Sequence, residues 1–266
     1  MTLEQILLLS LIQGLTEFLP VSSSGHLALV ASLKGWEYHG LAIDVAAHMG
    51  TLGSVLLYFW RDVIALLQGI WTLLKGKTDA NTRLLCNLVV ATLPVVVVGV
   101  LFDKLIGDSL KSLTIFAWMS IVFGSLLYVA DRGGALIQTV PDTTWKRALY
   151  FGLAQCLSLI NGVSRSGICL TLGRCLNYKR ADAAHFAFLM SIPTILAAGT
   201  LKGMHLVQEG DMSMVADALM VAFFSFLFGL GAITFMMRWL KTRTLTPFAI
   251  YRVLLGVLLL SGVLAY

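Results

Sequence analysis

The hydrophobic positions of this 266-residue chain form long continuous runs and do not alternate with polar positions. Six runs reach the roughly 20 residues that a membrane-spanning helix needs. We predict full spans over 41–60, 84–102, 113–130, 183–201, 214–236 and 248–265. A membrane β-barrel would instead show short alternating segments. The pattern therefore predicts an all-α, polytopic membrane protein.

Two further apolar stretches, 3–33 and 145–176, are each interrupted by a polar break that contains glycine and serine. Neither half of either stretch is long enough to cross a bilayer. Irregular backbone at membrane depth is tolerated only where protein or a water-filled cavity satisfies its polar groups. We therefore predict two re-entrant helical hairpins, each of which enters and leaves by the same face.

Composition agrees with a lipid solvent. Hydrophobic residues make up 58% of the chain and charged residues only 12%, against about 25% charged residues in soluble domains. The net charge of +5 does not indicate a nucleic-acid partner, because basic loops on one membrane face explain it. The four cysteines form no CxxC pair and are expected to be small buried hydrophobic residues.

Loop charge predicts the orientation in the membrane. One set of loops carries Arg61, Lys75, Lys77, Arg83, Arg132, Lys146, Arg147, Lys179, Arg180, Arg238, Lys241 and Arg243, and the other carries Lys34, Lys104, Lys111 and Lys202. By the positive-inside rule the richer set is cytoplasmic, which places both termini on the outer side. Arg174 and Arg180 lie near the cytoplasmic boundary, where we expect them to reach toward headgroups.

The two broken stretches also repeat one motif. "VSSSG" (21–25) recurs as "VSRSG" (163–167), with Gln13 and Gln155 at equal distances upstream. We predict an inverted-topology repeat with halves of about 1–130 and 131–266, within a single integral-membrane domain over 1–266. Repeats of this kind bind their ligand near the midplane, where the halves meet. The two serine motifs are therefore predicted to face each other.

The second motif has the chemistry of an oxyanion site. An arginine at the bilayer centre costs at least about 2.5–3.5 kcal/mol and normally has a partner, and the donors of Arg165 suit a phosphate. Ser164 and Ser166 add hydroxyl donors, and Gly167 lets backbone N–H groups approach closely. Helix N-termini favour anions.

The first motif adds reactive groups. Glu17 and Gln13 share one face of a helix, His26 can act as acid, base or nucleophile near neutral pH, and a serine beside a base is a common nucleophile. Ser22, Ser23 and Ser24 open the following helix. Together the two motifs predict phosphoryl-transfer chemistry at membrane depth.

Plainer interpretations stay open for several of these residues. Membrane serines often only bond a neighbouring helix, and Glu17 with Arg165 could form a structural ion pair. His48 and His185, which open two of the predicted spans, are expected to be packing residues.

At these residues the chain resembles the bacterial undecaprenyl-diphosphate phosphatases, also called bacitracin-resistance proteins or BacA. "QGLTEFLPVSSSGH" (13–26) matches the first family motif throughout, and "NGVSRSGIC" (161–169) matches the second in its centre. Asn161 stands in place of the family proline and Cys169 in place of a threonine. His48 and His185 stand where members carry Gln and Glu.

The resemblance implies an enzyme of the bacterial cytoplasmic (inner) membrane that hydrolyses undecaprenyl (polyprenyl) diphosphate to the monophosphate and phosphate. That reaction recycles the lipid carrier for peptidoglycan synthesis and gives bacitracin resistance. In this interpretation Arg165, Ser164 and Ser166 hold the diphosphate, and Glu17 acts with His26 and a loop serine. Ser23 is the candidate nucleophile, with attack by histidine or water left open. Ser22, Ser24, Gln13 and Gly167 complete the predicted substrate contacts.

The resemblance also implies a metal cofactor, Mg²⁺ or Ca²⁺, shared between Glu17 and the diphosphate oxygens. Two other classes of function stay open: a lipid-phosphate flippase or transporter of the same fold, and a non-catalytic lipid-binding subunit. The sequence permits a monomer or a homodimer, and it does not define the prenyl chain length.

Overall fold

The structure is a computed structural model that describes residues 1–36, 40–105, 112–209 and 215–262. Within these ranges the chain is almost entirely helical and forms no β-strand, as the hydrophobic runs predicted. The helices are α1 (Leu3–Phe18), α2 (Ser23–Lys34), α3 (Leu41–Tyr58), α4 (Trp60–Leu74), α5 (Ala80–Leu105), α6 (Leu113–Gly133), α7 (Trp145–Cys156), α8 (Arg165–Cys175), α9 (Arg180–Glu209), α10 (Val215–Trp239) and α11 (Thr246–Leu260), with short 3₁₀ turns at Val140–Asp142 and Leu157–Leu159.

Five of the six predicted spans are confirmed by length and hydropathy: α3, α5, α6, α9 and α10 are long and apolar enough to cross a membrane. The sixth prediction, 248–265, was too long. The helix there, α11, has 15 residues and is apolar but shorter than the other five, which corresponds to about 22 Å of rise. Residues 263–265 of that prediction lie outside the described ranges.

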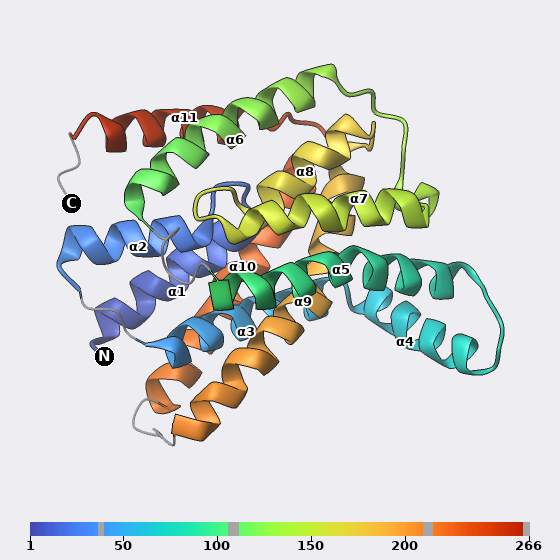
Figure 1. Ribbon diagram of the computed structural model, residues 1–266, viewed down its shortest axis with the longest axis horizontal. Helices are drawn as coiled ribbons and strands as arrows, with labels where there is room; N and C mark the ends of the chain where they lie inside the picture. Colours follow the sequence, from blue (N-terminus) through green and yellow to red (C-terminus); the bar gives the residue numbers. More distant parts are fainter. Residues whose placement is uncertain (37–39, 106–111, 210–214, 263–266) are drawn as a thin grey trace.

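Both predicted hairpins form, and they point in opposite directions. In Figure 1, α1 and α2 start and end near the two chain termini, whereas α7 and α8 start and end on the far side. A contact of 3.1 Å joins Lys34 at the end of α2 to Glu4 at the start of α1. Likewise Thr143 before α7 bonds Tyr178 after α8 at 2.8 Å. Each hairpin therefore returns to the end where it began.

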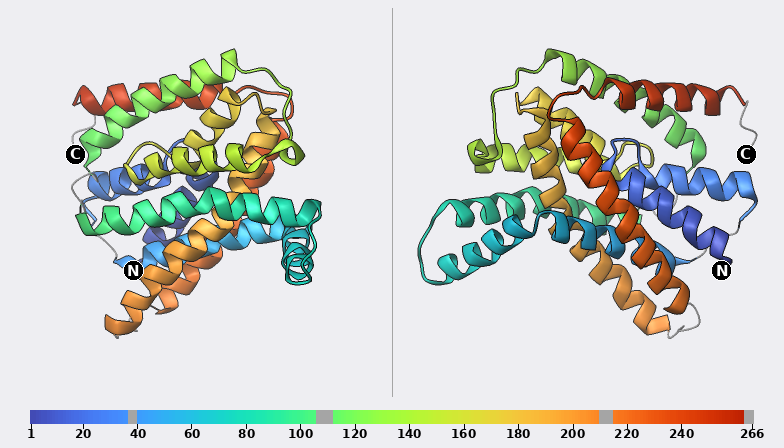
Figure 2. Two further views of the ribbon diagram at one scale, coloured as in Figure 1. Left: turned by 45° about the vertical axis from the view of Figure 1, so that its right-hand side comes forward. Right: turned by 180° about the vertical axis from the view of Figure 1, so that it is seen from behind.

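Segment 61–83, which connects two of the predicted spans, is mostly helix. Helix α4 covers most of it and lies against the start of α5, forming an arm that projects from the body of the molecule (Figure 2). Gly69 lets α4 approach the backbone of Asn81 and Thr82 closely, while Leu67, Trp71 and Leu74 stay exposed. Charged and polar residues in this amphipathic helix dilute its mean hydropathy, so the hydrophobic runs did not reveal it.

The two halves of the chain pack in matching ways. Helix α1 lies along α10, and its counterpart α7 lies along α5. Helices α6 and α11 cross at Gly124 and Gly256: a Cβ on Gly124 would lie 3.2 Å from the Ala249 carbonyl, and one on Gly256 would lie 2.5 Å from the Ala117 carbonyl. Because each glycine meets the equivalent residue of the other helix, the crossing is nearly twofold. This packing supports the inverted repeat, whose membrane orientation stays a prediction.

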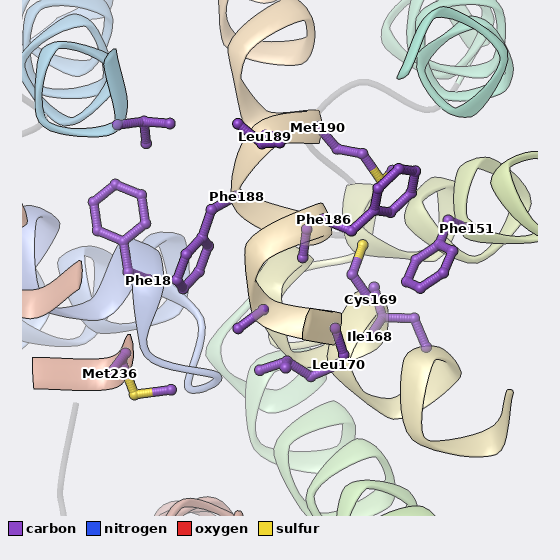
Figure 3. Close-up of a cluster of buried hydrophobic side chains, with 14 of the residues drawn as sticks. Phe18, Phe151, Ile168, Cys169, Leu170, Phe186, Phe188, Leu189, Met190 and Met236 are labelled. Carbon is purple, nitrogen blue, oxygen red and sulfur yellow. The ribbon is translucent and has the colours of Figure 1, made fainter. Parts of the chain in front are cut away.

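Helix α9 joins the two hairpins through the core. Its Phe188 packs edge-on against Phe18 of α1, with ring centroids 5.4 Å apart, and its Phe186 packs against Phe151 of α7 at 4.9 Å. Figure 3 shows these aromatic pairs on opposite sides of α9. Aromatic pairs in such geometries add to the stabilisation from burial alone. The hairpins are therefore held against one common element.

Arg174 does not reach toward headgroups as predicted, because it is completely buried. Its Nε donates to Asp131 Oδ1 at 3.2 Å, and Arg180 Nε donates to the same oxygen at 2.6 Å. The second Asp131 oxygen accepts the Leu245 backbone N–H at 2.9 Å. A buried arginine requires a partner, and this carboxylate joins the ends of α6 and α8 to the starts of α9 and α11.

The α3–α10 contact gives a test of the packing. An added Cβ on Gly50 would lie 2.1 Å from the Ala222 backbone oxygen, so Gly50→Ala must separate two backbones. We expect it to lower the free energy of unfolding by about 1–3 kcal/mol, measured by denaturation in detergent. Gly231→Ala is the matched control, because a Cβ there meets no atom within 4 Å. Equal stability of the two variants would contradict the close α3–α10 approach.

Candidate functional site

The tips of the two hairpins meet inside the molecule. Helix α1 ends at Phe18 and α2 begins at Ser23, while α8 begins at Arg165. The residues just before the second helices, Ser22 and Ser164, both have left-handed backbone, with φ of 76° and 70°. They hold the same place in the two serine motifs. Such conformations cost roughly 1–3 kcal/mol each and are retained where the surroundings enforce them.

Glu17 is the centre of this junction. Its carboxylate is 8% exposed. Arg165 Nη2 of the other hairpin donates to Oε1 at 2.8 Å, and Ser23 Oγ donates to Oε2 at 2.7 Å. Gln13, one turn earlier on α1, donates to Oε2 at 3.1 Å. Ser23 and Arg165 occupy equivalent motif positions, so the acid lies between matching residues of the two repeats.

Two further bonds cross between the tips in a symmetric way. Ser166 Oγ donates to the Leu19 carbonyl at 2.9 Å, and its counterpart Ser24 donates to Asn161 Oδ1 at 3.0 Å. Asn161 holds the same place in its motif as Leu19 does in the first. Asn161, which stands in place of the family proline, therefore supplies a hydrogen-bond acceptor for Ser24. The predicted meeting of the two motifs is confirmed by these contacts.

The junction has donors left for an oxyanion. Arg165 Nη1 is buried and, within the described part of the chain, has no hydrogen-bond partner. Ser24 of the first motif is exposed. Ser164 Oγ accepts the Gly167 N–H at 3.1 Å and so caps α8. Ser22 Oγ lies 3.4 Å from Ser24 Oγ, and Ser164 Oγ lies 3.2 Å from Ser166 Oγ. A buried unsatisfied donor is costly, so the arrangement favours an incoming acceptor.

His26 points away from the Glu17 carboxylate. Its Nδ1 lies 2.7 Å from the Ser22 carbonyl, and its Nε2 lies 2.7 Å from the hydroxyl of Tyr251 on α11. Because a carbonyl oxygen only accepts, Nδ1 carries the proton and the neutral ring accepts from Tyr251 at Nε2. Among the described contacts His26 makes none with Glu17, Ser23 or Arg165, and its predicted acid–base role stays a prediction.

His48 reaches the site, although we expected it to be a packing residue. Its Nε2 lies 3.8 Å from Glu17 Oε2, and its Nδ1 lies 2.8 Å from the Asp44 carbonyl. His185, its counterpart in the second half, instead lies 3.2 Å from Asp62 and stacks on Phe59. The only sequence signal that could have placed His48 at the site was the presence of a histidine at equivalent positions in the two halves of the chain.

Arg252 is the second residue that sequence reasoning missed. It lies in the middle of α11, is 1% exposed, and contacts backbone carbonyls of both hairpin tips. A lone arginine in an apolar run was a signal for a buried partner, but α11 carries no motif that would identify the partner.

The described residues contain no cluster of three or more His, Cys, Asp and Glu side chains that could hold a metal ion. At the site, Glu17 Oε2 and His48 Nε2 lie 3.8 Å apart. Mg²⁺ and Ca²⁺ prefer oxygen ligands, and Mg²⁺ commonly uses one or two carboxylates together with substrate phosphates. These residues therefore fit a metal only in combination with substrate oxygens.

Comparison with known proteins agrees with this geometry. The family model described as "Bacitracin resistance protein BacA" matches residues 6–258. A protein of Jannaschia sp. named undecaprenyl-diphosphatase is 47% identical over all of both chains. One of Ruegeria pomeroyi with the same name is 46% identical over 98% of each chain. Undecaprenyl-diphosphatase 1 of Rhodospirillum rubrum is 44% identical over 100% of this chain and 96% of its own.

The Ser24–Asn161 contact gives a direct test of the junction. In a background without the four native cysteines, we expect S24C/N161C to form a disulfide on mild oxidation. Ser24 Oγ lies 3.0 Å from Asn161 Oδ1, so the two side chains point toward each other, and a disulfide requires Cβ atoms about 3.5–4.5 Å apart. Mass spectrometry of the linked peptides measures the yield. S24C/G134C is the control pair, since Gly134 lies near Arg174 beyond the far end of α8. Equal yields from both pairs would contradict the meeting of the tips.

Proposed function

This chain belongs to the bacitracin resistance protein BacA family, and from that membership we propose that it is an integral-membrane phosphatase. Its substrate is undecaprenyl (polyprenyl) diphosphate, which it hydrolyses to the monophosphate and phosphate. The relatives reported above, all named as undecaprenyl-diphosphatases, support this substrate. The reaction returns the lipid carrier to peptidoglycan synthesis and gives bacitracin resistance, as the family description indicates.

One observation supports the chemistry most strongly: Glu17 lies between Ser23 Oγ at 2.7 Å and Arg165 Nη2 at 2.8 Å. A carboxylate that accepts a hydroxyl proton from a serine has the geometry of a general base beside its nucleophile. The guanidinium supplies positive charge where phosphoryl oxygens would lie. A purely structural ion pair would not require the serine contact.

In this mechanism Glu17 takes the Ser23 hydroxyl proton as Oγ attacks the terminal phosphorus. The new Oγ–P bond forms as the bond from phosphorus to the bridging oxygen breaks, and its electron pair leaves with the polyprenyl monophosphate. Arg165 and the motif serines stabilise the charge on the transferring group. Glu17 then gives the first proton to the departing polyprenyl monophosphate and is a carboxylate again. In the second step water attacks the phosphoserine, Glu17 takes a proton from that water, and this proton passes to Ser23 Oγ as the Oγ–P bond breaks and phosphate departs.

The site has a single carboxylate, and the diphosphate carries several negative charges. Mg²⁺ or Ca²⁺ held by Glu17 and the diphosphate oxygens would neutralise part of that charge when bound. Gln13, Ser22, Ser24, Ser164, Ser166 and Gly167 complete the proposed substrate contacts.

The proposed setting is the bacterial inner membrane, with both termini on the outer side. The start of α1 and the end of α11 lie at one end of the molecule, and the basic α4–α5 arm lies at the other (Figure 2), which agrees with the charge distribution of the loops. The N-terminal amine is paired with Asp217 at the start of α10. The prenyl tail would lie along the apolar faces of the spans. Assembly as a homodimer stays a prediction.

A transporter of lipid phosphates would use the same cradle without a base or a nucleophile. Purified protein in detergent distinguishes the two functions, because a phosphatase releases phosphate there and a transporter does not. No contact in the described structure favours the transporter over the hydrolase.

Three variants test the assignment. We expect Glu17→Gln and Ser23→Ala to lower kcat by about 10²–10⁴-fold, because they remove base and nucleophile. Arg165→Lys should lower it by about 10²–10³-fold, because lysine keeps the charge but loses the two-pronged donor geometry. Phosphate release from undecaprenyl diphosphate is the measurement, and the exposed Arg243→Lys is the control.

Wild-type rates in all three variants would refute the site. A Ser23→Ala variant that retains most activity while Glu17→Gln loses it would instead assign the attack to water activated by Glu17.

A further inference from the structure

Arg252 is a buried cation with no role in the mechanism above. It lies in the middle of α11, is 1% exposed, and its described contacts are all with backbone carbonyls. A guanidinium inside a membrane protein is costly and is retained where it has a specific task. Carbonyl oxygens solvate a cation without neutralising it, so these contacts indicate positioning of the backbone.

The carbonyls come from both hairpin tips. Arg252 Nη2 donates to Gly162 at 2.7 Å and to Val163 at 3.0 Å, and Nη1 donates to Pro20 at 3.3 Å. A longer contact of 3.5 Å reaches Met119 on α6. Pro20 and Gly162 hold the same place in the two motifs, two residues before Ser22 and Ser164. One side chain therefore joins equivalent points of the two repeats.

The Pro20 and Gly162 carbonyls lie close in sequence to two residues with strained backbone. Ser22 and Ser164 have φ of 76° and 70°, and helix α1 and the 3₁₀ turn that follows α7 have already ended when the chain reaches them. The carbonyls of the turn have no helical partner and need donors from elsewhere. Arg252 supplies donors to both turns from one rigid, planar group.

We propose that Arg252 is a positioning residue that fixes the two tips relative to each other, so that Ser23 and Arg165 lie on either side of Glu17. It acts through the backbone, two to three residues before those side chains, and touches neither substrate nor reacting atoms. Tyr251, its neighbour on α11, holds His26 of the first tip at 2.7 Å. Helix α11 thus contacts both tips through consecutive residues.

The catalytic part of this inference rests on the proposed function, but its geometric part does not. Lysine at position 252 keeps the charge and has donors that diverge from a single nitrogen, so it cannot reproduce the planar fork that bonds both tips. Methionine fills similar space without charge or donors. Misplacement of reacting groups by about 1 Å can cost about 10²-fold in rate, with less effect on substrate affinity.

The experiment compares Arg252→Lys and Arg252→Met with Arg174→Lys. Arg174 is the matched control because it too is a fully buried arginine that bonds backbone carbonyls, but it does so at the far end of α8. We expect Arg252→Met to lower kcat by about 10²-fold with KM changed much less. The kcat of Arg252→Lys should lie between that of Arg252→Met and that of the wild type. Arg174→Lys should lower the unfolding temperature while the folded fraction keeps its kcat.

A second measurement is independent of catalysis. The disulfide yield of S24C/N161C reports the registry of the tips, and we expect Arg252→Met to lower it and Arg174→Lys to leave it unchanged. If Arg252→Met does not fold, Arg252→Lys carries the same comparison. Wild-type kcat together with wild-type disulfide yield in the folded variants would overturn the inference. A wild-type protein that releases no phosphate, but whose disulfide yield depends on Arg252, would refute the proposed function and leave the positioning role standing.

Discussion

The structure depends on one constraint: two helical hairpins end inside the molecule, where their unpaired backbone groups must be satisfied by protein. The tips meet this requirement by bonding each other and α11. Ser166 donates to the Leu19 carbonyl, Ser24 donates to the Asn161 side chain, and Arg252 donates to Pro20 and Gly162. The same bonds that satisfy the broken helices also define where the polar side chains of both tips point.

A nearly symmetric scaffold here holds an asymmetric set of reactive groups. Ser23 and Arg165 occupy matching positions, yet one is a hydroxyl and the other a guanidinium, and both bond the same carboxylate. Glu17 has Leu159 as its counterpart in the second repeat. The first half therefore supplies the acid and the hydroxyl, and the second half supplies the guanidinium group. Neither hairpin alone would form the site.

Much of the fold could be predicted because lipid makes hydropathy decisive: five spans follow directly from apolar runs. The hairpins and the meeting of Glu17 with Arg165 followed from a repeated motif around a polar break. What escaped prediction depends on tertiary contacts. Helix α4 buries Gly69 against α5 and exposes Trp71. Arg174 forms an ion pair with Asp131, which lies on another helix. Arg252 belongs to no motif, and His48 was marked only as one of two histidines in equivalent positions, so only the packing of α11 and α3 brings them to the tips.

Arg174 and Arg252 are both fully buried, but they differ in how their charge is compensated. Arg174 shares Asp131 with Arg180, at the end of the molecule opposite the termini. Near the tips, Arg165 is paired with Glu17, while the described contacts of Arg252 are all with carbonyls. Of these two guanidinium groups only Arg165 is paired with a carboxylate among the described contacts, which leaves excess positive charge in surroundings where water screens it poorly. Carbonyl dipoles stabilise that charge without cancelling it, which supports the proposed binding of a multiply charged anion.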